Sequence, residues 1–128
     1  MTRVVVTQCV VIFSKFQEIR DALDQRLVTL ISAAGGLALP IPNGLTANIN
    51  IFQSWISAFR PEAIILSGGN DIGQCEERDE TERQLIEFAQ TNTVPVLGIC
   101  RGMQMLGIKG GSKLKTVSGH VSTNHKLT

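Results

Sequence analysis

The sequence predicts an α/β fold in which helices cover both faces of an open, mostly parallel sheet. Short apolar runs alternate along the chain with longer segments whose apolar residues recur every three or four positions, which is the period of an amphipathic helix. One run, Ala63–Leu66, is apolar at every position, as expected of a central parallel strand that is buried on both faces. Such strands alternating with helices favour a parallel sheet with a helical layer on each side.

The first forty residues are expected to form a strand, a helix and a second strand. Val4–Thr7 predicts a buried strand, and the β-prone run Val10–Phe13 allows a longer one. A helix is expected from about Phe16 to Ala34, because apolar residues there recur at helical steps. These residues are Ile19, Leu23, Leu27, Leu30 and Ile31. A pair of glycines ends this helix, and Leu37–Ile41 follows as the second strand.

The middle of the chain repeats the alternation twice. Asn48–Phe59 predicts a helix, and Ala63–Leu66 predicts the third strand. The segment Ser67–Asp71 is a turn, since it combines glycines with short polar residues. A polar helix is expected from about Asp79 to Gln90, with Leu85, Ile86 and Ala89 facing inward, and Val94–Ile99 is the fourth strand.

The pattern weakens after the fourth strand. Met103–Leu106 predicts a short helix, which Gly107, Gly110 and Gly111 are expected to break. Lys113–Val117 is a candidate strand, and residues 119–128 are expected to be a polar loop or tail. No repeat or linker divides the chain, so we treat residues 1–128 as one domain, incomplete at its C-terminus for the reason given below.

Composition excludes several classes of function. The chain has 128 residues and a formal net charge of +1, so no strong field favours nucleic acid or an anionic membrane. Its apolar stretches are too short to span a bilayer, and its N-terminus lacks the cleavage site of a signal peptide. The three cysteines, Cys9, Cys75 and Cys100, fit neither a disulfide framework nor a zinc site. We therefore expect a cytoplasmic protein without a metal or cofactor.

The pentapeptide from Gly98 to Gly102 is the most informative motif. It places Cys100 between the fourth strand and the following helix, with a glycine two residues away on each side. This is the pattern of a nucleophile elbow with cysteine in place of serine. A thiol at a helix N-terminus is stabilised as the thiolate, the form that attacks acyl groups. The alternative is a tight turn that holds a buried, inert cysteine.

A second glycine-rich turn, Ser67-Gly68-Gly69, follows the third strand. In open α/β sheets, ligands bind where the carboxyl ends of parallel strands meet, so this turn and Cys100 are expected at one edge. Backbone N–H groups of the glycines, together with that of Arg101, are suited to form an oxyanion hole. The alternative is a turn with no role in chemistry.

Three segments together resemble the class I glutamine amidotransferase superfamily, a group with a flavodoxin-like fold. They are Ile64–Ile72, Arg78–Glu82 and Val94–Gln104. The resemblance extends along essentially the whole chain. It is strongest to the γ-glutamyl hydrolase branch, which includes the γ-glutamyl-γ-aminobutyrate hydrolases.

The resemblance implies a role for each matching residue. Cys100 would be the nucleophile that forms a γ-glutamyl thioester, and Gly69 and Arg101 would supply oxyanion N–H groups. Gln104 and Gly68 would help to hold the glutamyl group. The expected ligand is glutamine or a small γ-glutamyl amide.

The charged motif at the start of the third expected helix has no role that the resemblance assigns. It contains Arg78, Asp79 and Glu82. We expect a solvated helix start there, in which Asp79 and Glu82 form a pair like that of a capping box.

The chain departs from the family pattern in its C-terminal part. The family's catalytic histidine belongs to a His-x-Glu string, whereas this sequence has only His120 and His125 and no acidic residue after Glu87. Neither histidine matches the position of the triad base. We therefore expect a truncated reading frame or an N-terminal fragment, which would protonate a leaving amine poorly.

Three functions remain open on this evidence. The first is a Cys-dependent hydrolase of γ-glutamyl amides, intact or as a fragment, and the arginine that follows the cysteine favours it. The second is a glutaminase subunit that delivers ammonia to a synthase partner. The third is a non-catalytic remnant. We also expect a shortened parallel sheet to expose apolar surface, and therefore to form homo-oligomers or aggregates.

Overall fold

The computed structural model describes residues 1–99 and 101–110, with the backbone alone for Arg101 and residues 108–110. The described residues form a parallel four-stranded sheet in the order β4-β1-β5-β6. The strands are β1 (Thr2–Val6), β4 (Gly36–Pro40), β5 (Ala63–Leu66) and β6 (Val96–Gly98). The order begins the flavodoxin-like arrangement, in which the strand after the first lies on one side of it and the later strands lie on the other.

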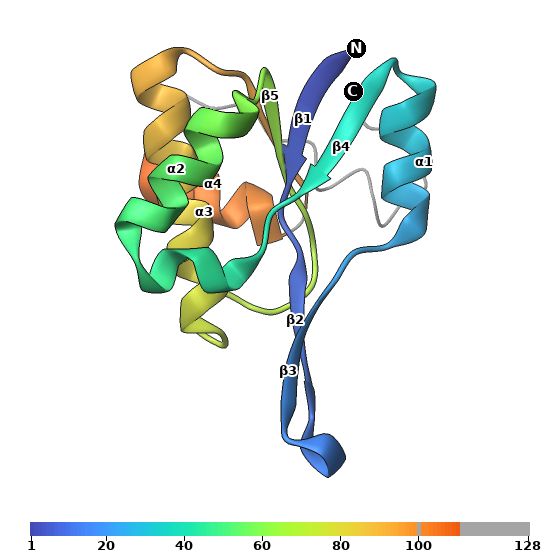
Figure 1. The fold of residues 1–128 in the computed structure, drawn as a ribbon, viewed down its shortest axis with the longest axis vertical. Coiled ribbons are helices and arrows are strands. Elements are labelled where there is room, and N and C mark those ends of the chain that lie inside the picture. Colours follow the sequence, from blue (N-terminus) through green and yellow to red (C-terminus); the bar gives the residue numbers. More distant parts are fainter. Residues whose placement is uncertain (100, 111–128) are drawn as a thin grey trace.

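Helices cover both faces of this sheet (Figure 1). They are α1 (Gln25–Ala33), α2 (Ile49–Phe59), α3 (Glu76–Asn92) and α4 (Arg101–Gly110). Helix α1 packs on one face, where its Ile31 contacts Val4 and Val6 of β1. The other three helices pack on the opposite face. The predicted fold class, an α/β fold with a mostly parallel sheet, is therefore confirmed.

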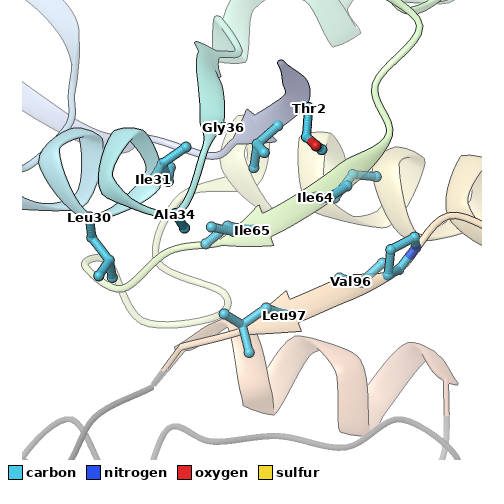
Figure 2. Close-up of a pocket in the computed structure, with 12 residues that line it drawn as sticks. Thr2, Leu30, Ile31, Ala34, Gly36, Ile64, Ile65, Val96 and Leu97 are labelled. Carbon is cyan, nitrogen blue, oxygen red and sulfur yellow. The ribbon is translucent and has the colours of Figure 1, made fainter. Parts of the chain in front are cut away.

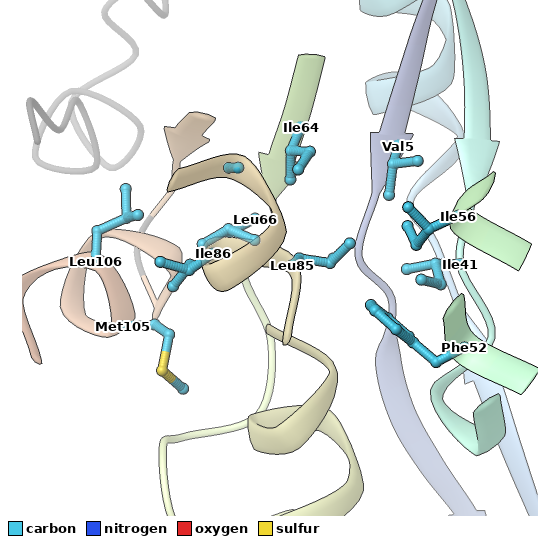
Figure 3. Close-up of a cluster of buried hydrophobic side chains, with 11 residues drawn as sticks. Val5, Ile41, Phe52, Ile56, Ile64, Leu66, Leu85, Ile86, Met105 and Leu106 are labelled. Carbon is cyan, nitrogen blue, oxygen red and sulfur yellow. The ribbon is translucent and has the colours of Figure 1, made fainter. Parts of the chain in front are cut away.

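The larger core lies between the sheet and helices α2, α3 and α4 (Figure 3). Alternate residues of the strands point into it, including Val5, Ile64 and Leu66. The helices contribute Phe52, Ile56, Leu85, Ile86, Ala89, Met105 and Leu106. Burial of these side chains fixes the strands, and hence the loops at their carboxyl ends.

A β-hairpin replaces the first half of the expected first helix. Strand β2 (Cys9–Phe13) pairs antiparallel with β3 (Glu18–Ala22) around a short 3₁₀ turn, η1 (Ser14–Phe16). The hairpin projects from the body of the molecule (Figure 1), and Ile19 is exposed on it. The prediction of a helix from Phe16 was wrong because the β-branched residues before the turn have a pairing partner after it. Helix α1 begins only at Gln25, where the side chain of Asp24 caps it.

The other expected elements are present with shifted ends. Helix α3 begins at Glu76, earlier than predicted, and β6 is shorter than the expected strand. Helix α4 continues through Gly107 to Gly110, so the prediction that Gly107 breaks it was wrong. An isolated glycine weakens a helix by only about 1 kcal/mol. A second 3₁₀ segment, η2 (Asn43–Ala47), follows β4.

The predicted strand Lys113–Val117 and the tail lie outside the described residues, as do His120 and His125. Across the portion that is described, none of the helices has the length and apolar character that crossing a membrane requires.

Candidate functional site

The candidate site is the edge of the sheet where β1, β5 and β6 end. Leu66 and Gly98 are register partners on neighbouring strands, so the segments after them leave the sheet side by side. The N–H of Ile99 donates to the carbonyl oxygen of Leu66 at 2.9 Å, which extends this pairing beyond the strands. Thr7, directly after β1, and Ser67, directly after β5, are both buried here. The segments after β5 and β6, which the sequence predicted to share one edge, therefore leave the sheet side by side, and the segment after β1 joins them there.

The elbow is packed so closely that both of its glycines are required. A Cβ atom on Gly98 would lie 2.7 Å from the carbonyl carbon of Gly102 and 2.8 Å from Leu106 Cδ1. A Cβ atom on Gly102 would collide with the carbonyl oxygen of Leu66. The N–H of Gly102 donates to the carbonyl oxygen of Ile99 at 2.9 Å, and α4 begins at Arg101. Both glycines are therefore required by the close approach of α4 to β5 and β6.

Cys100, the predicted nucleophile, lies outside the described residues. In the chain it stands between Ile99, which is buried, and the first residue of α4. Arg101, predicted to supply an oxyanion N–H, is that first helical residue. Gln104 lies on α4 and is exposed. The described part of the elbow thus places α4 with its N-terminus beside the end of β5.

The glycine loop after β5 has a backbone that only glycine adopts readily. Gly69 has φ +110°, and Gly68 is half-buried while Gly69 is exposed. A Cβ atom on Gly69 would lie 2.6 Å from Cys9 Cβ and 2.8 Å from Arg78 Nη1. Both the positive φ and the close neighbours exclude a larger residue at this position. The loop backbone is therefore held against the start of β2 and against α3.

A buried hydrogen-bond network ties the start of this loop to β1 and α3. The N–H of Ser67 donates to Thr7 Oγ1 at 2.9 Å, and Ser67 Oγ donates to the carbonyl oxygen of Thr7 at 2.6 Å. Thr7 Oγ1 in turn donates to Glu82 Oε2 at 2.7 Å. All three residues are buried. Hydrogen bonds in such an interior are stronger than in water, so this network resists movement of the loop.

Arg78 completes this network from α3. Its Nη2 atom donates to the carbonyl oxygen of Ser67 at 2.7 Å and to Ser67 Oγ at 3.1 Å. The same atom lies 3.5 Å from Glu82 Oε2, in an ion pair with both side chains fully buried. Its Nη1 atom donates to Asn70 Oδ1 at 3.3 Å. The guanidinium therefore contacts the loop on both sides of Gly68-Gly69.

Asn70 fixes the far side of the loop to the hairpin. Its Oδ1 accepts the N–H of Val10 at 2.8 Å, and its Nδ2 donates to the carbonyl oxygen of Val10 at 3.0 Å. The side chain amide thus pairs with the backbone of β2 as a neighbouring strand would. The loop from Ser67 to Asn70 is consequently anchored at both ends.

The expectation of a solvated start for α3 was wrong. Arg78, Asp79 and Glu82 are buried, and the helix is preceded by Cys75, which makes no side-chain cap bond. Asp79 Oδ2 instead accepts the N–H of Gly73 at 2.8 Å. Sequence reasoning missed this network, although a signal was present. Extending the inward face of Leu85 and Ala89 back by helical steps reaches positions 78 and 82.

An apolar hollow on the α1 side of the sheet is not part of this edge (Figure 2). It has a volume of about 440 Å³ and lies near the amino ends of the strands, with Thr2, Gly36 and Ala63 in its lining. None of the residues that line it carries a titratable side chain. In addition, the described residues contain no cluster of three or more His, Cys, Asp or Glu side chains able to hold a metal ion.

Three relatives show what this chain is similar to. The gamma-glutamyl-CDP-amidate hydrolase of Campylobacter jejuni is 38% identical over 88 residues, which cover 64% of this chain and 42% of that protein. A glutamine amidotransferase-like protein of Rickettsia prowazekii is 28% identical over 123 residues, or 84% of this chain and 42% of that protein. The carbamoyl phosphate synthase small chain of Pseudomonas aeruginosa is 40% identical over 75 residues, or 58% of this chain and 19% of that protein.

Each of these matches spans less than half of the relative's length. A protein-family model matches nearly the whole chain: the model for Peptidase C26 matches residues 5–127. The match includes the elbow, the glycine loop and the buried network. The chain therefore belongs to the Peptidase C26 family.

Proposed function

We propose that this chain carries the nucleophilic half of a Cys-dependent hydrolase that cleaves γ-glutamyl amide bonds. The observation that supports this most directly is the packing of the elbow, where both glycines are forced by contacts across β5, β6 and α4. The name of the Campylobacter jejuni relative, a gamma-glutamyl-CDP-amidate hydrolase, adds support for the chemical class of substrate.

In the proposed reaction, the Cys100 thiolate attacks the γ-carbonyl carbon of the substrate and forms a C–S bond. The carbonyl electron pair moves to the oxygen, where the N–H groups of Gly69 and Arg101 stabilise the negative charge. Collapse of this intermediate breaks the C–N bond, and the amine leaves after it takes up a proton. Water then hydrolyses the thioester, releasing glutamate and restoring the thiol.

The described residues contribute to the first of these steps. Gly68 and Gln104 are proposed to hold the glutamyl group, because they flank the elbow on the loop and on α4 respectively. Proton transfer to the amine requires an acid that the described residues do not supply at this edge. A test of the proposal should therefore use a leaving group that departs without protonation.

A γ-glutamyl p-nitrophenyl ester meets this requirement. We expect the 128-residue chain to release a burst of p-nitrophenolate and to carry a glutamyl group on the peptide that contains Cys100, as seen by mass spectrometry. Cys100→Ala should abolish the burst, whereas Cys75→Ala, which removes a half-buried thiol before α3, should leave it unchanged. A burst that survives Cys100→Ala would refute the proposal.

A second candidate is a glutaminase subunit that passes ammonia to a synthase. The similarity to a carbamoyl phosphate synthase small chain favours it, since that relative is named as a subunit of a synthase. Both candidates use the same thioester, so the burst does not separate them. A synthase that co-purifies with the chain and stimulates glutamine hydrolysis would separate the second from the first.

A further inference from the structure

The contacts of Arg78 point to a role beyond holding the fold together. We propose that Arg78 is a positioning residue, which fixes the direction of the Gly69 N–H group toward the developing oxyanion. This inference rests on the proposed function above. It follows from the two separate loop contacts that the guanidinium makes, at the carbonyl oxygen of Ser67 and at Asn70 Oδ1.

The loop needs an external anchor because its centre has no side chains. Gly68 and Gly69 have the widest backbone freedom of any residues, and an oxyanion donor is effective only when it is held in place before the reaction. Arg78 contacts the residue before the two glycines and the residue after them. Its Nη1 atom also lies close to the Gly69 backbone, since a Cβ atom on Gly69 would be only 2.8 Å from it. The guanidinium therefore packs against the turn itself as well as against the residues on either side of it.

The anchor is itself rigid. Arg78 is fully buried and ion-paired with Glu82, which also accepts a hydrogen bond from Thr7. On the far side, Asn70 is fixed to the backbone of Val10. Movement of the loop would therefore break several buried hydrogen bonds at once.

Arginine is required for this arrangement, and lysine is not equivalent. The two terminal nitrogens of Arg78 donate to acceptors on opposite sides of the glycine pair, whereas an ammonium has one nitrogen at the end of a flexible stem. Arg78→Lys keeps the positive charge beside Glu82 but loses one of the two anchors. This variant therefore tests the positioning of the loop without removing the buried positive charge.

The reactions of Cys100 offer a readout that a purely structural role would not change. Attack on an ester develops an oxyanion, whereas alkylation by iodoacetamide is a displacement at carbon that develops none. A misplaced Gly69 N–H should slow the first reaction and spare the second. Removing one oxyanion donor slows acyl transfer by about a hundredfold to a thousandfold, so misplacement should slow it by about tenfold to a hundredfold.

We would measure both rates at Cys100 by mass spectrometry, with the γ-glutamyl p-nitrophenyl ester and with iodoacetamide. Arg78→Lys is expected to lower the rate of acylation by about tenfold to a hundredfold and to leave the rate of alkylation unchanged. The matched control is Arg83→Lys, on the same helix, whose guanidinium forms ion pairs at the surface with Glu76 at 3.5 Å and Glu80 at 3.1 Å. The control should change neither rate.

The possible outcomes separate the two proposals. If wild-type Cys100 is not acylated, the proposed function is overturned and this inference falls with it. If the wild-type chain is acylated and Arg78→Lys lowers both rates equally, or neither, the positioning role is overturned alone. Should Arg78→Lys fail to fold by circular dichroism, Asn70→Ala takes its place, because it removes the far anchor and keeps the buried ion pair. A selective loss of acylation is expected there too, and its absence would likewise overturn the inference.

Discussion

Glu82 supplies the negative charge that compensates the buried guanidinium of Arg78. Its carboxylate faces Arg78 at 3.5 Å, and neither side chain is exposed to solvent. Removing one member of a buried ion pair leaves the other charge without compensation, which destabilises a protein by about 3–5 kcal/mol. We therefore expect Glu82→Gln, which keeps the shape of the side chain, to lower the free energy of unfolding by about 3 kcal/mol. Urea denaturation followed by circular dichroism would measure this change.

The matched control for Glu82→Gln is Glu80→Gln. Glu80 lies on the same helix and pairs with Arg83 at 3.1 Å, but each side chain of this pair is 36% exposed. Partly exposed pairs contribute about 0–1 kcal/mol, so the control should have a much smaller effect. Equal losses of stability in the two variants would mean that the buried charge is not the cause.

The elbow glycines could be placed from the sequence, whereas the members of the buried network could not. Gly98 and Gly102 could be predicted, because their spacing around a cysteine is specific to one local geometry. Arg78 and Glu82 could not be placed from their residue types, since charged residues are almost always at the surface. Their burial depends on Thr7 and Ser67, which are distant in the chain and meet only when β1 and β5 pair.

At the scale of elements, the boundary between the hairpin and α1 was the largest error. Apolar residues at helical steps continue from Ile19 into Leu23 and Leu27, so the pattern alone did not separate a strand from a helix. The competing signal was Asp24, a favoured cap residue, whose side chain accepts the N–H of Arg26 at 2.9 Å. A cap in the middle of a long periodic segment indicates that the helix begins there.

The Asp24 cap also predicts how the stability of the fold depends on pH. The pKa of Asp24 is lowered from its ordinary value of 3.8 to about 2, first by the side-chain hydrogen bond with Arg26 and then by the backbone hydrogen bond from that residue. Because the pKa is lower in the folded state, the ionised carboxylate stabilises the fold above pH 3.8, and this contribution is lost as the pH falls toward 2. Asp24→Asn keeps an acceptor but has no charge to lose.

We therefore expect the melting temperatures of wild type and Asp24→Asn to converge as the pH falls from about 4 to about 2. Thermal melts followed by circular dichroism at several pH values would show this. Asp71→Asn, a change at an exposed turn, serves as the control for loss of a surface carboxylate. A gap between wild type and Asp24→Asn that stays constant over this range would contradict the prediction.

At the scale of the whole molecule, the sheet and its helical layers could be predicted because the alternation of strands and helices restricts the possible topologies. Parallel strands joined by helices follow a consistent handedness, so fully apolar runs such as Ala63–Leu66 lead to a central position. The hairpin was not predicted, because its stability depends on a partner strand and on the contacts of Asn70 and Asp21 at its base. Asp21 accepts hydrogen bonds from Asn43 there.

The projecting hairpin also carries the two most exposed isoleucine side chains among the described residues. Ile12 and Ile19 are paired across the two strands, so they lie on one face, and they are 69% and 63% exposed. Phe16 at the tip is 60% exposed. A two-stranded hairpin is at best marginally stable in water on its own, and exposed apolar side chains beside open strand edges favour association. The molecule is therefore expected to associate with itself through this hairpin.

This expectation leads to a measurement at two sites. The double variant Ile12→Thr and Ile19→Thr keeps the β-branched shape that favours strands and removes the apolar surface. We expect it to lower the sedimentation coefficient of the chain and its binding of a hydrophobic dye. Ile51→Thr, at an exposed position of α2, removes a similar side chain away from the hairpin and should change neither quantity. A wild-type chain that sediments as a monomer and binds no dye would show that the hairpin surface does not drive association.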